Sequence, residues 1–226
     1  MQLPIESIRE QFERTFLELG PGGRIVLTAP TGSGKSTRIP LWCQAVSGEL
    51  VLVIEPRRVA ARTLAEWFAK GRGEEVGETV GYTIRFENRS SPQTNILFVT
   101  PGVARRFLTE DTLSNFQTII FDEFHERSWE TDALLALIAG QGEAGPRIVI
   151  MSATLTANRL AERYSAALLE AEGRTFPVSV RYVGDDSELT VPSTRQLATR
   201  AANAVKKAWQ RKEEESFLVF MPGLSA

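Results

Sequence analysis

Nine consecutive residues near the start of the chain carry its clearest chemical signal. They read Ala29-Pro30-Thr31-Gly32-Ser33-Gly34-Lys35-Ser36-Thr37 and match the phosphate-loop pattern, with alanine in place of its first glycine. The glycines allow successive backbone amides to point at phosphates, and Lys35 adds a positive charge where charge develops during phosphoryl transfer. The Ser36 hydroxyl is suited to Mg²⁺. The loop therefore predicts ATP and Mg²⁺ as cofactors, although by itself it would fit several classes of nucleotide-binding protein.

Acidic residues after another apolar run supply the other half of such a site. Residues 118–121 read Thr-Ile-Ile-Phe, and Asp122, Glu123, Phe124 and His125 follow at once. Asp122 is suited to hold magnesium through water, and Glu123 to orient and deprotonate an attacking water. A solvated turn could also carry two adjacent carboxylates, but the upstream loop favours the catalytic interpretation. Ser36, Asp122 and Glu123 are therefore the predicted metal-binding residues.

Motifs elsewhere in the chain narrow the class of nucleotide-binding protein. The sequence lacks the Asn-Lys-x-Asp motif of guanine-nucleotide switches and the Leu-Ser-Gly-Gly-Gln signature of transporter ATPases. Small-molecule kinases have no reason to carry Ser152-Ala153-Thr154 directly after an apolar run. A motor or a related ATPase remains.

The elements that must position these residues alternate along the chain. Five short apolar runs predict strands, at residues 24–28, 50–54, 96–100, 118–121 and 147–151. Helical spacing is found at residues 4–19, 36–45, 59–70, 102–109, 131–139 and 157–165. Near-continuous apolar strands that alternate with helices are typical of an α/β fold, in which helices cover both faces of a mostly parallel sheet.

The pattern changes after residue 172. Residues 173–192 read as an extended connection, residues 191–211 as a long helix, and residues 216–221 as a final strand. We therefore expect a first domain at residues 1–172, an interdomain connection at 173–192, and the beginning of a second domain at 193–226. Since the chain stops soon after the final strand begins, we expect it to be the front part of a longer protein.

The composition leaves the kind of partner open. The chain has 226 residues and a net charge of −2, so its overall charge does not indicate a nucleic-acid partner. Hydrogen-bond donors along a single groove would nevertheless be enough to bind a phosphate backbone. Cys43 is the only cysteine, so a reducing compartment fits best. No apolar segment of the sequence approaches the length that spans a bilayer. We expect a cytoplasmic protein without a membrane partner.

The ordered motifs together resemble those of the DEAH-type RNA helicases of superfamily 2, most closely the bacterial HrpB group. The segments that carry the resemblance are the phosphate loop and residues 55–61, 81–87, 100–102, 122–127, 152–154 and 173–178. The resemblance implies a RecA-like P-loop NTPase domain and the start of a second RecA-like domain. It also implies an ATP-dependent helicase motor, which couples hydrolysis of ATP to ADP and phosphate with strand translocation or unwinding.

The resemblance also assigns roles within the nucleotide site. His125 would link this site to the motif at residues 152–154, where Ser152 and Thr154 would be its hydrogen-bonding partners. The catalytic residues are then Lys35, Glu123, His125, Ser152 and Thr154. Ser152 and Thr154 could also cap the helix that follows.

A second set of residues is expected to contact nucleic acid. The resemblance implies Arg57 and Thr100, with Arg85 in addition, on a single strand held in a groove between the two domains. Such contacts reach phosphate and sugar, so they position a strand without reading its sequence. RNA is expected rather than DNA only through the resemblance.

Three positions depart from the family pattern. Phe124 stands where the family name expects alanine, and this phenylalanine looks like the HrpB variant. Pro101 stands where many relatives have an acidic residue, which weakens the expectation of nucleic-acid contacts around Thr100. Trp67 stands where some relatives stack an arginine on the adenine; it could stack on a base or belong to the core.

Two functional classes stay open at this point. The first is the helicase motor, directed at RNA or at DNA. The second is an ATP-switched scaffold that recruits a nucleic acid or protein without unwinding. The family's arginine fingers belong to the second domain, and a finger of this kind is worth about 10³–10⁵ in rate. We therefore expect the 226 residues to bind ATP but to hydrolyse it poorly.

Overall fold

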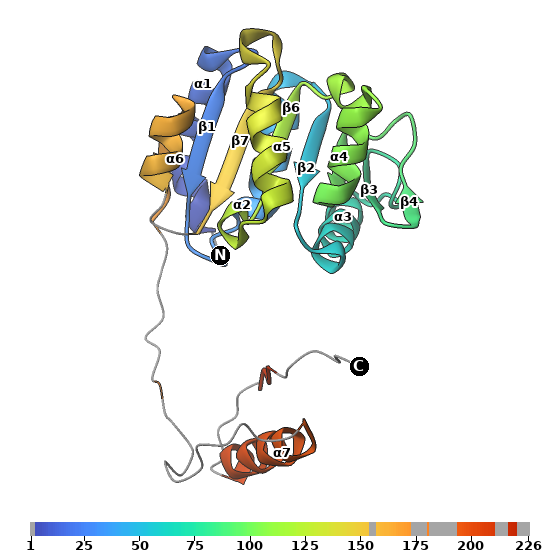
Figure 1. Ribbon diagram of the computed structural model, residues 1–226, viewed down its shortest axis with the longest axis vertical. Coiled ribbons are helices and arrows are strands. Elements are labelled where there is room, and N and C mark those ends of the chain that lie inside the picture. The colour runs from blue at the N-terminus through green and yellow to red at the C-terminus, as the bar shows by residue number, and fades with distance from the viewer. Residues whose placement is uncertain (1–2, 154–156, 173–179, 181–193, 211–216, 221–226) are drawn as a thin grey trace. The chain divides into compact units, whose positions relative to one another are not determined.

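The predicted apolar runs form the middle of an eight-stranded sheet in the computed structural model of the chain (Figure 1). The structure describes residues 3–153, 157–172, 180, 194–210 and 217–220. The chain divides into two units, residues 1–175 and 176–226, and each is described by itself.

The sheet of the first unit is almost entirely parallel. Its strands are β1 (Arg24–Thr28), β2 (Val51–Ile54), β3 (Val80–Ile84), β4 (Glu87–Arg89), β5 (Ile96–Val99), β6 (Thr118–Phe121), β7 (Arg147–Ser152) and β8 (Ala167–Glu170). They lie in the order β4-β3-β5-β2-β6-β7-β1-β8, and only the β3–β4 pair is antiparallel. This confirms the predicted α/β fold with a mostly parallel sheet. The parallel strands end at one edge of the sheet, which we call the carboxyl edge.

Helices cover both faces of this sheet. The longer ones are α1 (Arg9–Leu19), α2 (Lys35–Ser47), α3 (Arg58–Arg72), α4 (Pro101–Thr109), α5 (Trp129–Ala139) and α6 (Ala157–Tyr164). Short 3₁₀ helices are η1 (Pro4–Ile8), η2 (Thr112–Asn115), η3 (Phe124–Glu126) and η4 (Gly142–Ala144). Helices α1 to α3 pack into the hydrophobic core on one face, and α4 to α6 pack into the core on the other.

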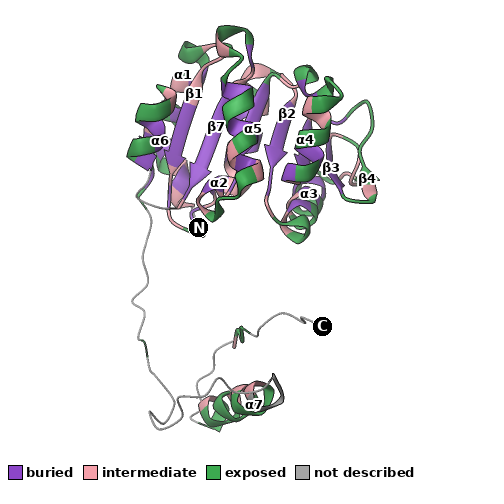
Figure 2. Cartoon of the chain, viewed as in Figure 1, coloured by how far each residue is buried: buried purple, intermediate pink, exposed green. Residues whose placement is uncertain are grey.

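The central strands are apolar throughout because both of their faces are buried. In β2, Val51 and Val53 belong to the core under α1 to α3, whereas Leu52 and Ile54 belong to the core under α4 to α6. All four side chains are buried. Figure 2 shows the same contrast between buried strands and helices with exposed outer faces. Two-sided burial explains why these strands read as continuous apolar runs instead of alternating ones.

Three strands escaped prediction. Strand β8 reads Ala-Leu-Leu-Glu, which are good helix formers, and parallel pairing with β1 overrides that preference. Strand β4 has only three polar residues, and β3 contains a glycine. The predicted helix at residues 4–19 is also two elements, η1 followed by α1.

The second unit contributes one described helix, α7 (Thr194–Gln210), close to the predicted helix at residues 191–211. The predicted strand at 216–221 is wrong for its four described residues, 217–220, which adopt no strand. A strand needs a neighbour with which to pair its backbone, and the described part of this unit contains no other extended segment that pairs with it. None of the described helices, in either unit, is long and apolar enough to cross a membrane.

Candidate active site

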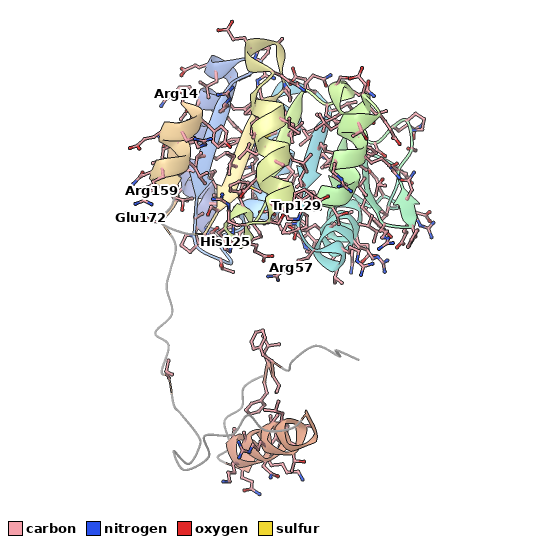
Figure 3. The ribbon with its side chains drawn as sticks, viewed as in Figure 1. Arg14, Arg57, His125, Trp129, Arg159 and Glu172 are labelled. Atoms are coloured by element: carbon pink, nitrogen blue, oxygen red, sulfur yellow. The ribbon has the colours of Figure 1, made fainter. Side chains whose placement is uncertain are left out.

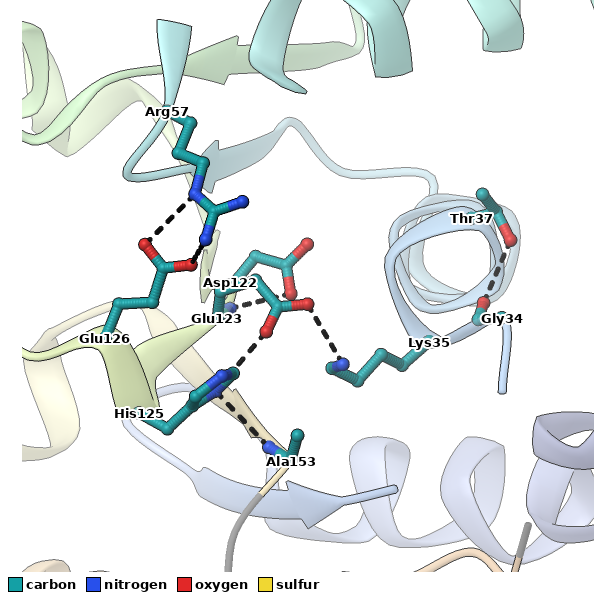
Figure 4. A network of polar contacts seen from close by, with 9 residues as sticks. All are labelled: Gly34, Lys35, Thr37, Arg57, Asp122, Glu123, His125, Glu126 and Ala153. Atoms are coloured by element: carbon teal, nitrogen blue, oxygen red, sulfur yellow. Dashed lines mark hydrogen bonds and ion pairs between the residues drawn. The ribbon is translucent and has the colours of Figure 1, made fainter. Parts of the chain in front are cut away.

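The predicted phosphate loop connects the end of β1 to the start of α2. Gly32 and Gly34 have φ angles of 78° and 96°, which lie in the left-handed region that favours glycine. Gly34 is the residue before the first turn of α2, and its carbonyl accepts hydrogen bonds from the amides of Thr37 and Arg38 at 3.1 and 3.0 Å. The Thr37 hydroxyl donates to the same carbonyl at 3.0 Å (Figure 4). The loop therefore has the backbone shape that the sequence predicted.

Contacts from two other segments, η1 and the end of β7, hold this loop and the start of α2 in place. The Ala29 amide donates to the Ser152 carbonyl at 3.2 Å, and the Ile5 amide donates to the Ser33 carbonyl at 3.1 Å. Arg38 Nε lies 2.7 Å from Glu6 Oε1. Ala29 itself is buried in the core, which accounts for a methyl group at the position of the first glycine.

One ion pair joins the phosphate loop to the acidic residues at the end of β6. Lys35 is only 3% exposed, and its Nζ donates to Glu123 Oε1 at 3.0 Å. Glu123 has a φ of 45°, which is unusual for a residue with a side chain, and its amide donates to Asp122 Oδ1 at 2.8 Å. Strained conformations of this kind cluster at functional sites. The geometry thus brings together two motifs that lie 88 residues apart in the sequence.

Asp122 offers a buried oxygen that fits a divalent cation. Its Oδ2 is buried without a hydrogen-bond partner among the described residues. Burial raises the pKa of Asp122 to about 6, while a hydrogen bond from the Ser36 hydroxyl lowers it. The described part of the chain contains no cluster of three or more His, Cys, Asp or Glu that could hold a metal ion. One or two carboxylates together with waters and phosphates are what Mg²⁺ uses, so the donors present fit that ion.

His125 lies between the acidic residues and the end of β7. Its Nδ1 is 3.3 Å from Glu123 Oε2 and accepts from the Ala153 amide at 3.4 Å (Figure 4). An Nδ1 that accepts this bond is unprotonated and cannot also donate to Glu123, so the two contacts are alternatives. Ser152 is fully buried, and Thr154 lies outside the described residues. The catalytic roles of Ser152 and Thr154 remain predictions.

A groove of about 830 Å³ opens beside this site at the carboxyl edge. Of the predicted nucleic-acid residues, Thr100 and Arg85 line it directly. Arg57 instead pairs with Glu126, a residue of the groove wall. Figure 3 shows Arg57 and His125 at the same edge of the first unit. Four further arginines line the groove: Arg58, Arg105, Arg106 and Arg127.

The turn between β3 and β4 presents Arg85 to the groove. Phe86, the next residue, has a φ of 66° and is 93% exposed, and the Arg85 guanidinium lies 4.7 Å from the centre of its ring. The turn is tied down by Glu87, which accepts from the Tyr82 hydroxyl at 2.5 Å and pairs with Arg62 of α3. Arg85 is therefore held on a braced turn instead of a loose loop.

Thr100 precedes α4 and leaves its hydroxyl available to the groove. The Thr100 side chain makes no capping hydrogen bond, although its carbonyl accepts from Val103 and Ala104. Pro101 occupies the first turn of α4, a position that suits proline because its missing amide proton would have no helical partner. This accounts for the proline that departs from the family pattern.

Trp67 is not a core residue. It lies on α3 with 48% of its surface exposed. Its ring packs edge-on against that of Phe68, with 5.3 Å between the ring centres. Stacking of Trp67 on adenine remains a prediction.

Two acidic residues of the site were missed from the sequence. Glu55 follows β2 directly and is buried, and burial together with the nearby charge of Asp122 raises its pKa to about 8. An acidic residue directly after an apolar run was the signal that found Asp122, and the same signal marks Glu55. Glu126 became visible only through its partner Arg57, since no spacing in the sequence links the two.

Several known proteins are similar to this chain in sequence. The DEAD/DEAH box helicase family matches residues 10–162. The chain is 38% identical to ATP-dependent RNA helicase HrpB of Escherichia coli (strain K12), over 98% of this chain and 27% of that protein. It is 31% identical to probable ATP-dependent RNA helicase DHX34 of Mus musculus, over 89% of this chain and 18% of that protein.

Solved structures show the same relationship. The crystal structure of E. coli DEAH/RHA helicase HrpB matches with a TM-score of 0.82 and 36% identity, over 98% of this chain and 28% of that one. A second structure, of E. coli DExH-box NTPase HrpB, matches with a TM-score of 0.76 and 37% identity, over 99% and 27%. The first unit therefore has the RecA-like fold, and the chain spans about a quarter of the length of HrpB. The chain belongs to the DEAD/DEAH box helicase family.

Proposed function

We propose that this chain is an ATP-binding motor domain of a helicase that acts on single-stranded RNA. The observation that carries the proposal is the contact between Lys35 Nζ and Glu123 Oε1 at 3.0 Å. It brings a phosphate-binding lysine and a candidate general base to one point, where a γ-phosphate and an attacking water would meet. An ATP-switched scaffold would need the phosphate loop but not this base.

Each residue of the site has a task in the proposed reaction. The loop amides and Lys35 bind the β- and γ-phosphates, and Lys35 exchanges its contact with Glu123 for the phosphate. Ser36 and Asp122 would hold Mg²⁺, which neutralises charge on the phosphates when bound. Glu123 orients the attacking water and takes its proton. His125 lies between Glu123 and Ala153, so a change in its contact with Glu123 can alter its contact with the end of β7.

The nucleic-acid strand would occupy the groove beside the nucleotide site. Thr100, Arg85 and Arg57 offer donors to phosphate and sugar, and these contacts would position the strand without selecting a sequence. RNA is proposed because two similar proteins are described as RNA helicases. We also propose that a second RecA-like domain closes over this groove and supplies arginine fingers, and that the protein works in the cytoplasm. A fully buried free cysteine is consistent with a reducing compartment.

Hydrolysis separates this proposal from a scaffold. We expect the 226-residue chain to turn ATP over slowly and with little stimulation by single-stranded RNA. In single-turnover assays with excess protein, Glu123→Gln should lower the rate about 10²- to 10⁴-fold while ATP affinity stays within about twofold, because a general base acts on the reaction and not on binding. Glu18→Gln, an exposed site on α1, is the charge-matched control.

Equal hydrolysis by Glu123→Gln and the unmodified chain would contradict the proposed base. Rapid RNA-stimulated turnover by the 226 residues would contradict the need for a second domain.

A further inference from the structure

The arginine proposed to bind a nucleic-acid phosphate is already held by a carboxylate. Arg57 Nε lies 3.3 Å from Glu126 Oε2, and a second guanidinium nitrogen pairs with Glu126 Oε1 (Figure 4). The two parallel contacts are also how a guanidinium grips a phosphate. Glu126 therefore presents to Arg57 the same pair of oxygens that a nucleic-acid backbone would present.

The two partners are not equally free to move. The Arg57 side chain is 70% exposed, whereas that of Glu126 is 29% exposed and forms part of the groove wall. Arg57 is a long side chain that solvent reaches easily, so an incoming phosphate can approach it. The pair therefore opens most readily by movement of Arg57.

The backbone under Glu126 is fixed by other contacts. Glu126 ends η3, and its amide donates to the Glu123 carbonyl at 2.9 Å. The buried Phe124 anchors the same turn, and the Arg127 guanidinium lies 5.2 Å from the centre of that ring. Arg127 also pairs with Asp132 at 2.7 Å. Glu126 would thus stay at the groove wall after Arg57 leaves it.

We infer that Glu126 is a positioning residue that competes with nucleic-acid phosphate for Arg57. The inference rests on the proposed function, because it assigns Arg57 to a strand in the groove. Binding a phosphate then requires exchange of one ion pair for another. Exposed pairs are weak, so the competition lowers affinity by only about two- to fivefold. Since Glu126 and Glu123 share one turn, the exchange also alters the charges beside the proposed base.

Binding of a fluorescein-labelled single-stranded oligouridine, followed by anisotropy at low salt, tests the inference. Glu126→Gln should bind the oligonucleotide about two- to fivefold more tightly than the unmodified chain, because the amide no longer competes for the guanidinium. Glu126→Asp keeps the charge and should stay close to the unmodified chain. Arg57→Ala should bind more weakly, and adding Glu126→Gln to it should change affinity no more than the distant Glu18→Gln does.

A purely structural role for Glu126 would produce another pattern. Unchanged or weaker binding by Glu126→Gln, or equal tightening with and without Arg57, would overturn the inference. If Arg57→Ala still weakened binding, the proposed groove would stand. No loss of affinity in Arg57→Ala, or no binding by the unmodified chain, would instead contradict the nucleic-acid assignment in the proposed function and the inference with it.

Discussion

Two buried carboxylic acids of the candidate site, Glu55 and Asp122, directly follow the neighbouring parallel strands β2 and β6. The backbone hydrogen bonding between these strands extends to Asp122, because its amide donates to the Ile54 carbonyl at 2.9 Å. Burial is the main cause of the raised pKa of each acid. Nearby negative charges add to it, because Asp122 raises the pKa of Glu55 and Glu123 raises that of Asp122. A nearby positive charge acts in the opposite direction, and the Lys35 ammonium lowers the pKa of Asp122 in this way.

Stability should fall as pH rises through the titration range of Glu55. The pKa of Glu55 rises from 4.5 in the unfolded chain to about 8 in the folded one, so the folded chain binds more protons between these values. The stabilisation is complete below about pH 4.5 and is lost as pH approaches 8. Urea unfolding should be measured at pH 5 and pH 8. The free energy of unfolding of Glu55→Gln should exceed that of the unmodified chain by on the order of 2 kcal/mol at pH 8 only.

The prediction is contradicted if the free energy of unfolding changes equally with pH in Glu55→Gln and in the unmodified chain. That result would show that Glu55 is ionised in the folded state. Glu18→Gln serves as the exposed control, and it should follow the unmodified chain at both pH values.

Residue types revealed the nucleotide half of the site better than the groove half. A phosphate loop and a pair of acidic residues have a fixed local order, so the sequence alone predicts Lys35 and Glu123, which the structure places 3.0 Å apart. The partners of Arg57 and His125 are Glu126 and the Ala153 amide, and these depend on how separate strand ends meet. Distances between strand ends are set by the sheet order, which no local pattern encodes.

Among the secondary-structure elements, the β3–β4 turn is the part of the groove that was hardest to predict from the sequence. Gly81 of β3 faces the backbone of β4, and a methyl group at its position would lie 2.4 Å from the Arg89 carbonyl oxygen. Residues 81–87 resemble a family motif, but the strands that they form are short, polar or interrupted by glycine. Their structure comes from pairing and from the contacts of Glu87, not from local preference.

Gly81→Ala should therefore damage the groove selectively. Forcing β4 away should cost about 1–3 kcal/mol in the free energy of unfolding and weaken oligouridine binding through Arg85. ATP binding should change little, because β3 and β4 lie at the far end of the strand order from β1. Urea unfolding and the two binding assays measure these effects.

Gly71→Ala is the matched control for this substitution. Gly71 lies in α3 with nothing within 4 Å of the added methyl group, so alanine there should leave stability unchanged or raise it by about 1 kcal/mol. Equal losses in both variants, or no loss in Gly81→Ala, would contradict the proposed role of the turn.

In the first unit as a whole, the strand order places both proposed sites at one edge of the sheet. The proposed nucleotide site lies at the ends of β1, β7 and β6, and the groove lies at the ends of β6, β2, β5 and β3. Strand β6 borders both proposed sites, and Asp122 and Glu123, which follow it directly, also line the groove. This arrangement follows from a parallel sheet, in which all functional strand ends meet at one edge.

The sequence predicted the α/β class and the five central strands because buried parallel strands are apolar along their whole length. It could not predict the strand order, nor the edge strands β4 and β8, whose residues are polar or helix-forming. In the second unit the helix α7 follows the prediction closely, while residues 217–220 form no strand. The division of the chain into domains at residues 172 and 192 stays a prediction.

Direct titration of the 226-residue chain with ATP and Mg²⁺, by isothermal calorimetry, tests whether the loop and Lys35 form an ATP site. We predict saturable binding of one ATP that weakens about 10- to 100-fold in Lys35→Ala, because a buried charged hydrogen bond to phosphate is lost. Removal of Mg²⁺ with EDTA should also weaken it. Equal affinity in Lys35→Ala, or no ATP binding by the unmodified chain, would contradict the proposed ATP site.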